Sequence, residues 1–217
     1  MNATIGLQRP WRWWLALGAL VWTAWACNPT PGTGRFDAAQ LEIGGCDEDV
    51  MPWEPGFFTI DNFDDSVTTI RLQSVGGGID RLDGIFIQVD RKFLLDNVGE
   101  EVPLGPPAAR QNLADAGVEG IPLPLEGESE QGVVRAVVGF YQTCPEATDI
   151  PEPVGTIRFT RFEPEFEGQI TGFITAPVVI DGRTGDAIGE SFTGRFSFKV
   201  QKGRPYTNFT GPGNFDP

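Results

Sequence analysis

The sequence predicts an all-β protein, an antiparallel sandwich or barrel with at most one short helix. Three observations favour this fold class. Apolar and polar residues alternate with a period of two along several segments, as on strands that bury one face. Further segments are rich in β-branched residues, which also favours strands. Turns rich in Gly and Pro separate these segments, which is typical of sandwiches and barrels built from many short strands.

The clearest predicted strand covers residues 191–200. Its other face is polar, and its apolar face consists of Phe192, Gly194, Phe196, Phe198 and Val200. The same spacing occurs in 132–142 and 84–90, and the β-branched segments are 66–74, 155–162 and 168–180. Residues 181–186 separate two of these strands and predict a hairpin loop. Gly172 and Gly194 lie inside strands beside aromatic residues, where bare backbone leaves room for a neighbouring ring.

Residues 107–116 are the single helix candidate. Pro107 suits the first helical position, and Gly117 suits the position just after the last turn. The candidate lies within a polar stretch at about 97–131 that is rich in Pro, Gly and Glu. The composition of that stretch predicts a long loop.

The N-terminus has the pattern of an export signal. Residues 1–12 carry Arg9 and Arg12 and no acid, and residues 13–26 are almost wholly apolar. A positive start followed by a short apolar core and small residues is typical of a signal peptide. The apolar run is shorter than the roughly 20 residues that a membrane-spanning helix needs. Ala24-Trp25-Ala26 then leads directly into Cys27.

The placement of Cys27 resembles the lipobox of bacterial lipoproteins. The resemblance implies that residues 1–26 are removed as a signal peptide and that Cys27 is acylated and becomes the new N-terminus. Asn28 follows, where Asp in this family often retains a protein in the inner membrane, so the resemblance implies the outer membrane of a Gram-negative bacterium. We expect residues 27–39 to serve as anchor and tether and residues 40–217 to form a single β domain. The alternative is an ordinary secreted protein.

The cysteine count agrees with this interpretation. The chain has three cysteines, Cys27, Cys46 and Cys144, and an odd count in an exported protein leaves one thiol to explain. If Cys27 takes the lipid, Cys46 and Cys144 are left as a disulfide pair in an oxidising compartment. The alternative is two free, buried thiols.

Charge and composition exclude several classes of function. The chain has 16 basic and 30 acidic residues, and residues 1–26 contain two of the arginines and no acid. The remainder therefore has a net charge of −16, which repels nucleic acid and anionic lipid, so membrane attachment is expected through the anchor alone. The chain has no histidine, which excludes Ser-His-Asp and Cys-His nucleophilic sites and histidine-ligated metals.

Carboxylate chemistry remains, and it suggests two sites. Calcium binds six to eight oxygen ligands, and the candidate ligands on turns are Asp61, Asp64, Asp65, Asp80 and Asp83. The simpler interpretation is that these residues initiate turns by bonding their own backbone.

The second suggested site is an alternating set of glutamates. Glu163, Glu165 and Glu167 would share one face of a strand, and two carboxylates about 5–10 Å apart suffice for glycoside hydrolysis. A solvent-exposed face beside Pro164 is the simpler interpretation.

The sequence therefore predicts a lipid-anchored protein of the cell envelope with a non-enzymatic structural or binding role and no cofactor. One alternative is a carrier of small apolar ligands, with a β-barrel cavity lined by phenylalanines. The other alternative is a carboxylate-dependent hydrolase.

Overall fold

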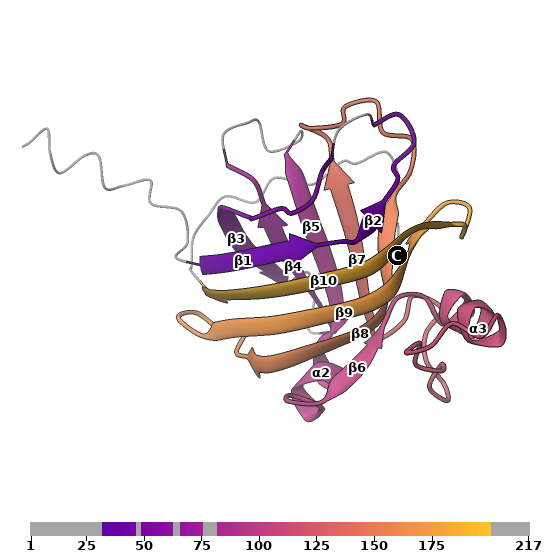
Figure 1. The fold of residues 1–217 in the computed structure, drawn as a ribbon. Coiled ribbons are helices and arrows are strands. Elements are labelled where there is room, and N and C mark those ends of the chain that lie inside the picture. Colours follow the sequence, from indigo (N-terminus) through magenta and orange to yellow (C-terminus); the bar gives the residue numbers. More distant parts are fainter. Residues whose placement is uncertain (1–31, 47–48, 63–65, 76–81, 201–217) are drawn as a thin grey trace, which may run out of the picture.

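The computed structural model of the chain describes residues 32–46, 49–62, 66–75 and 82–200. These residues form two antiparallel sheets whose strands run across one another (Figure 1), together with two short helices. The six-stranded sheet has the order β1-β10-β9-β8-β6, with β2 also paired to β10, and the four-stranded sheet has the order β3-β4-β5-β7. This arrangement confirms the predicted all-β class and is that of a sandwich.

The strand bounds follow most of the predicted segments closely. The six-stranded sheet contains β1 (Gly32–Asp37), β2 (Gln40–Leu41), β6 (Glu101–Leu104), β8 (Pro151–Phe162), β9 (Gln169–Asp181) and β10 (Ala187–Lys199). The four-stranded sheet contains β3 (Phe57–Asn62), β4 (Val67–Gln73), β5 (Asp83–Asp90) and β7 (Val134–Phe140). The predicted hairpin loop joins β9 to β10.

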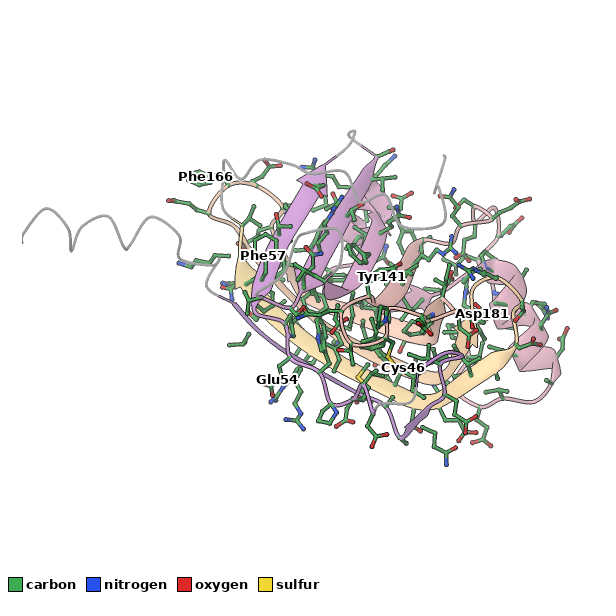
Figure 2. The ribbon with its side chains drawn as sticks, turned by 90° about the horizontal axis from the view of Figure 1, so that it is seen from above. Cys46, Glu54, Phe57, Tyr141, Phe166 and Asp181 are labelled. Atoms are coloured by element: carbon green, nitrogen blue, oxygen red, sulfur yellow. A yellow bond between two sulfur atoms is a disulfide. The ribbon has the colours of Figure 1, made fainter. Side chains whose placement is uncertain are left out.

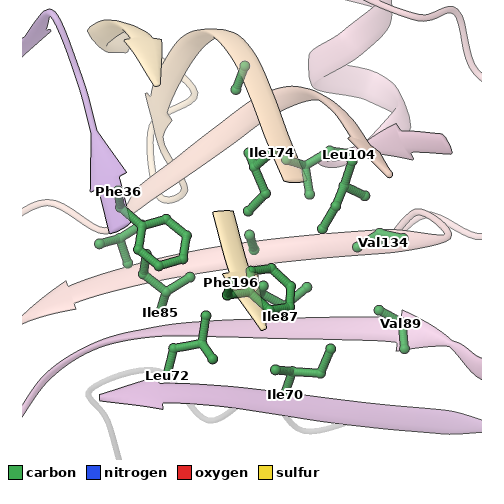
Figure 3. Close-up of a cluster of buried hydrophobic side chains, with 14 of the residues drawn as sticks. Phe36, Ile70, Leu72, Ile85, Ile87, Val89, Leu104, Val134, Ile174 and Phe196 are labelled. Atoms are coloured by element: carbon green, nitrogen blue, oxygen red, sulfur yellow. The ribbon is translucent and has the colours of Figure 1, made fainter. Parts of the chain in front are cut away.

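The core fills the space between the two sheets. Phe192, Phe196 and Phe198 of β10 are buried on the face that the alternation predicts, and Phe36 of β1 and Phe159 of β8 join them. The ring centroids are 6.1 Å apart for Phe36 and Phe192, and 5.9 Å apart for Phe159 and Phe196. Aliphatic side chains of the four-stranded sheet complete the cluster (Figure 3).

Two strand glycines make this aromatic packing feasible. A Cβ at Gly172 would lie 2.4 Å from Cζ of Phe196, and one at Gly194 would lie 2.3 Å from Cδ1 of Phe36. Both rings therefore lie over bare backbone of a neighbouring strand, as the sequence predicts.

The fold begins earlier in the chain than the sequence predicts. Gly32–Asp37 form β1, which pairs with β10 over its whole length, so the tether does not extend to residue 39. Phe36 is fully buried and exchanges two backbone hydrogen bonds of 2.9 Å with Trp53. Phe36 is the only large apolar residue among 28–39, so no alternation marks this strand.

The polar stretch at 97–131 is more ordered than a long loop. It contains β6 and the helix α3 (Pro107–Asp115), which confirms the helix candidate, with Pro107 in its first turn and Gly117 at φ +80° beyond its end.

A second helix, α2 (Arg91–Asp96), exceeds the expected number. It begins where the side chain of Asp90 accepts the N–H of Phe93. None of the helices in the described ranges is long and apolar enough to cross a membrane.

Candidate functional site

A depression of about 340 Å³ lies beside α3, on the outer side of the six-stranded sheet. Ala109 and Leu113 of α3 form one wall, and Glu152 of β8 and Asp181 at the end of β9 form the other. The helix lies there because outward-pointing side chains of β8 and β9 form a second, smaller core with it. The sheet residues of this small core are Val154, Val178 and Ile180.

Glu152 is held as a structural acceptor in this wall. Only 1% of its side chain is exposed, and both of its oxygens accept N–H groups of Arg135, with 3.0 Å between Nε and Oε2. Arg135 belongs to β7, so this ion pair joins the two sheets. Two parallel bonds between a guanidinium and a carboxylate form a strong and geometrically specific contact.

Asp181 is held in a similar way by backbone groups. Its carboxylate accepts the N–H groups of Ile150 at 2.9 Å and Arg183 at 3.2 Å. Burial by itself raises the pKa of Asp181, but these donors together with Thr184 outweigh burial, and the net pKa is lowered. Asp181 is therefore ionised at neutral pH and is unsuited to act as a general acid.

The three alternating glutamates do not line this depression. They lie in the turn between β8 and β9, not on a strand, and all three are exposed. Glu165 pairs with Arg91 of α2, and Glu163 lies 3.8 Å from Arg161. Exposed carboxylates beside cations lack the apolar surroundings that raise the pKa of a catalytic acid.

The structure separates the two calcium candidates that it describes. Asp61 of β3 pairs with Arg71 at 2.6 Å, and burial raises the pKa of Asp61 more than this cation lowers it. Across the sheet, Asp61 faces Thr69, and Thr69 faces Gln88. Asp83 lies five residues from Gln88 along β5, which places it roughly 17 Å from Asp61 along the strand direction at about 3.4 Å per residue.

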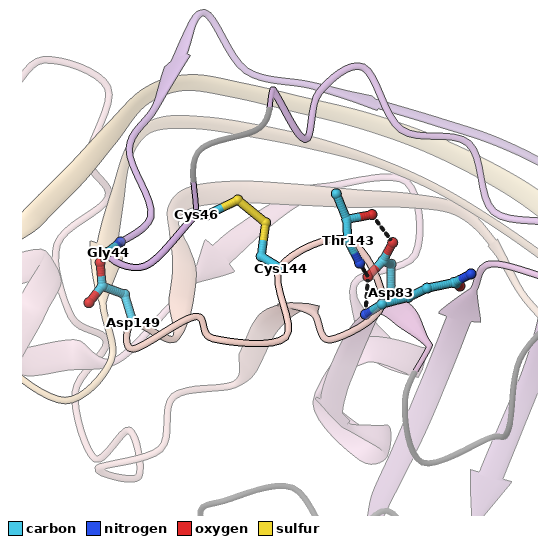
Figure 4. Close-up of a disulfide and its surroundings, with 7 residues drawn as sticks. Gly44, Cys46, Asp83, Thr143, Cys144 and Asp149 are labelled. Carbon is cyan, nitrogen blue, oxygen red and sulfur yellow. Dashed lines mark hydrogen bonds between the residues drawn. A yellow bond between two sulfur atoms is a disulfide. The ribbon is translucent and has the colours of Figure 1, made fainter.

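Asp83 has structural partners of its own. Its carboxylate accepts the N–H groups of Gln142 and Thr143 at 2.9 and 3.1 Å and the hydroxyl of Thr143 at 2.6 Å (Figure 4). Among the described residues, no group of three or more acidic or cysteine side chains gathers as a metal site would require. Outside the described residues lie the other three candidates, Asp64, Asp65 and Asp80.

The predicted pairing of Cys46 with Cys144 is present (Figure 4). Their Cα atoms are 5.2 Å apart, within the range of roughly 4.4–6.8 Å that disulfides adopt. Close by, the N–H of Gly44 donates to the carboxylate of Asp149 at 2.6 Å. These contacts tie the segment before β3 to the turn after β7.

The most connected buried charge is one that the sequence does not mark. Arg110 of α3 has no exposed surface and pairs with Glu128, whose side chain is 1% exposed. Its guanidinium also donates to backbone carbonyl oxygens at 3.0–3.2 Å, those of Gly105, Pro122 and Leu123. The only sequence signal is one arginine within a Glu-rich stretch, and this signal does not identify the partner.

Comparisons of the chain with known protein families, with curated proteins and with solved structures find no match. Cys27, the predicted site of lipid attachment, lies outside the described residues.

Proposed function

We propose that this protein is an exported, lipid-anchored β domain of a bacterial cell envelope, held at the outer membrane, with a structural or binding role. The observation that carries the proposal is the pairing of the cysteines. Cys46 and Cys144 lie together as a disulfide, which leaves Cys27 as the remaining cysteine of the chain. Cys27 stands where the lipobox of bacterial lipoproteins has its acylated residue, and a disulfide suits an oxidising compartment.

The use of the buried charges supports a non-catalytic role. Glu152 and Asp181 beside the depression accept hydrogen bonds from Arg135 and from backbone N–H groups. The carboxylate of Asp83 likewise accepts backbone N–H groups from the turn before Cys144. A catalytic carboxylate needs a pKa near the working pH and access to the substrate. These carboxylates instead fix turns and sheet contacts.

The filled core supports this role over that of a carrier. A carrier of apolar ligands needs an open cavity between its sheets. Between the sheets of this protein, six phenylalanines are each at most 2% exposed: Phe36, Phe58, Phe159, Phe192, Phe196 and Phe198.

Membrane fractionation tests the proposal. The full chain is expressed in a lipoprotein-competent Gram-negative host beside Cys27→Ser, which keeps the small residues Ala24 and Ala26 for ordinary signal cleavage. We expect the wild type to sediment with membranes in high salt and to be released by detergent. We expect the variant in the soluble fraction. A wild-type protein that is as soluble as Cys27→Ser contradicts the anchor.

A further inference from the structure

An anchor at Cys27 would hold one end of the sandwich against the lipid. Only residues 28–31 separate Cys27 from Gly32, the first residue of β1. Five Cα steps span at most about 18 Å. The 13 residues of β9 extend over about 43 Å. The end at which β1 starts therefore stays near the lipid at every tilt of the domain, whereas the far end reaches the lipid only if the domain lies flat.

The turn between β8 and β9, residues 163–168, lies at that same end. Gly32 faces Phe198, and Phe198 faces Ile170, so the start of β1 and the start of β9 are two strand spacings apart, about 10 Å. Figures 1 and 2 both show the turn at the end of the molecule where β1 starts, and α3 at the opposite end. The depression lies beside α3.

The turn presents an aromatic ring to its surroundings. Phe166 is 59% exposed, although the backbone around it is well bonded. The N–H of Gly168 donates to Glu165 at 2.9 Å, and the N–H of Glu167 donates to Val200 at 2.9 Å. The ring of Phe166 is thus held outward by an ordered turn.

The charges around Phe166 are balanced, in contrast to the net charge of −16 on residues 27–217. Glu165 pairs with Arg91, and Glu163 lies beside Arg161. Glu167 is the third acid of the turn, and Lys199, which faces Gln169 at the base of the turn, is the third cation. Balanced charge removes the repulsion that the acidic remainder of the surface would meet at a lipid headgroup layer.

We propose that Phe166 inserts into the lipid surface to which Cys27 is anchored, and that the turn 163–168 fixes the orientation of the domain. This inference rests on the proposed lipid anchor. A single side chain does not bind a membrane stably, but a short tether supplies a high effective concentration for such a second, weak contact. The resulting orientation directs the depression beside α3 away from the lipid, where an envelope partner has access to it.

Fluorescence quenching by brominated lipid tests the insertion. The acylated Phe166→Trp protein is reconstituted into phosphatidylcholine vesicles with or without bromine on the acyl chains. The matched control is Leu123→Trp, because Leu123 is 61% exposed in the segment after α3. The signal of Trp53 is subtracted using the unsubstituted protein. We expect the bromine to quench the tryptophan at position 166, whose emission also shifts to the blue, and to leave the tryptophan at position 123 unchanged.

Flotation of the same vesicles distinguishes failure of the insertion from failure of the anchor. If the acylated protein floats but bromine quenches neither position, or quenches both equally, the insertion of Phe166 is overturned and the anchor stands. If the protein does not float and carries no acyl mass, the anchor itself fails and the insertion fails with it. Circular dichroism of both tryptophan variants checks that the fold is intact.

Discussion

Replacing Arg110 with Met is expected to destabilise the protein strongly. The substitution keeps most of the buried volume but leaves the carboxylate of Glu128 without its cation. Only 1% of the Glu128 side chain is exposed. Among the described residues, that carboxylate then keeps two backbone donors, the N–H groups of Leu125 at 2.8 Å and Val133 at 3.2 Å. Removing one partner of a buried ion pair costs about 3–5 kcal/mol, a large fraction of a typical unfolding free energy of about 5–15 kcal/mol.

A double variant separates the effect of the unpaired charge on the free energy of unfolding from the effect of the lost packing. Arg110→Met with Glu128→Gln removes the unpaired charge and keeps an amide oxygen for the two backbone donors. The remaining loss consists mainly of hydrogen bonds to backbone carbonyl groups, which we expect to cost about 1–3 kcal/mol. The double variant is therefore expected to be more stable than Arg110→Met alone, which is a strongly non-additive result.

Urea unfolding followed by circular dichroism measures these free energies. The control is Arg158→Met, since Arg158 is exposed and its guanidinium carbon lies 5.7 Å from the Phe173 ring centroid. Surface changes of this kind stay within about 0.5 kcal/mol. Limited proteolysis is expected to cut residues 118–131 faster in Arg110→Met than in the wild type. A cost below about 1 kcal/mol for Arg110→Met, or additive costs in the double variant, would refute the role given to this ion pair.

Three further outcomes are expected. Cys46→Ser with Cys144→Ser, which opens a link across 98 residues, is expected to lose up to about 4.7 kcal/mol of stability on the chain-entropy estimate; two reactive thiols at these positions in the denatured, unreduced protein would contradict the pairing. Asp181 has a lowered folded pKa, so it stabilises the fold above its unfolded pKa, and this contribution disappears as the pH falls through the folded value. Urea unfolding at neutral and acidic pH should therefore show a cost of Asp181→Asn that shrinks on acidification, and a cost independent of pH would count against the assignment. Micromolar calcium is expected to leave the melting temperature unchanged because Asp61 and Asp83 are separated and already bonded; a site filled at 100 times its dissociation constant would instead add about 2.7 kcal/mol.

The long strands were predictable because their periodic signal is local. The alternation in 191–200 identifies the buried face of β10, and Gly172 and Gly194 mark where rings lie over backbone. Each of these features depends on neighbours in the sequence or on one adjacent strand, so the sequence alone reveals it.

The missed elements have little local signal. β1 contains Phe36 as its only large apolar residue, and its stability comes from pairing with β10 and from the contact with Trp53. The helix α2 has six residues, which are too few to show a helical repeat of 3.6 residues in the sequence. Its start depends on one cap from the side chain of Asp90.

The candidate site was predictable only in part. Acidic residues near turns were visible in the sequence, and Asp83 and Asp181 do fix turns, as the simpler interpretation states. The partners of Glu152 and Arg110 were not predictable, because they lie 17 and 18 residues away in sequence and meet only after the sheets and α3 have packed. The depression beside α3 arises from that packing, so no sequence motif predicts it.

The mature N-terminus tests the central claim most directly. Intact mass and peptide sequencing of the protein purified from membranes of a lipoprotein-competent host are compared with those of Cys27→Ser. We expect the wild type to begin at Cys27, to lack residues 1–26 and to carry added acyl mass on that residue, while Cys27→Ser carries none. A wild-type chain that begins elsewhere, keeps residues 1–26 or has an unmodified Cys27 would contradict the lipid anchor.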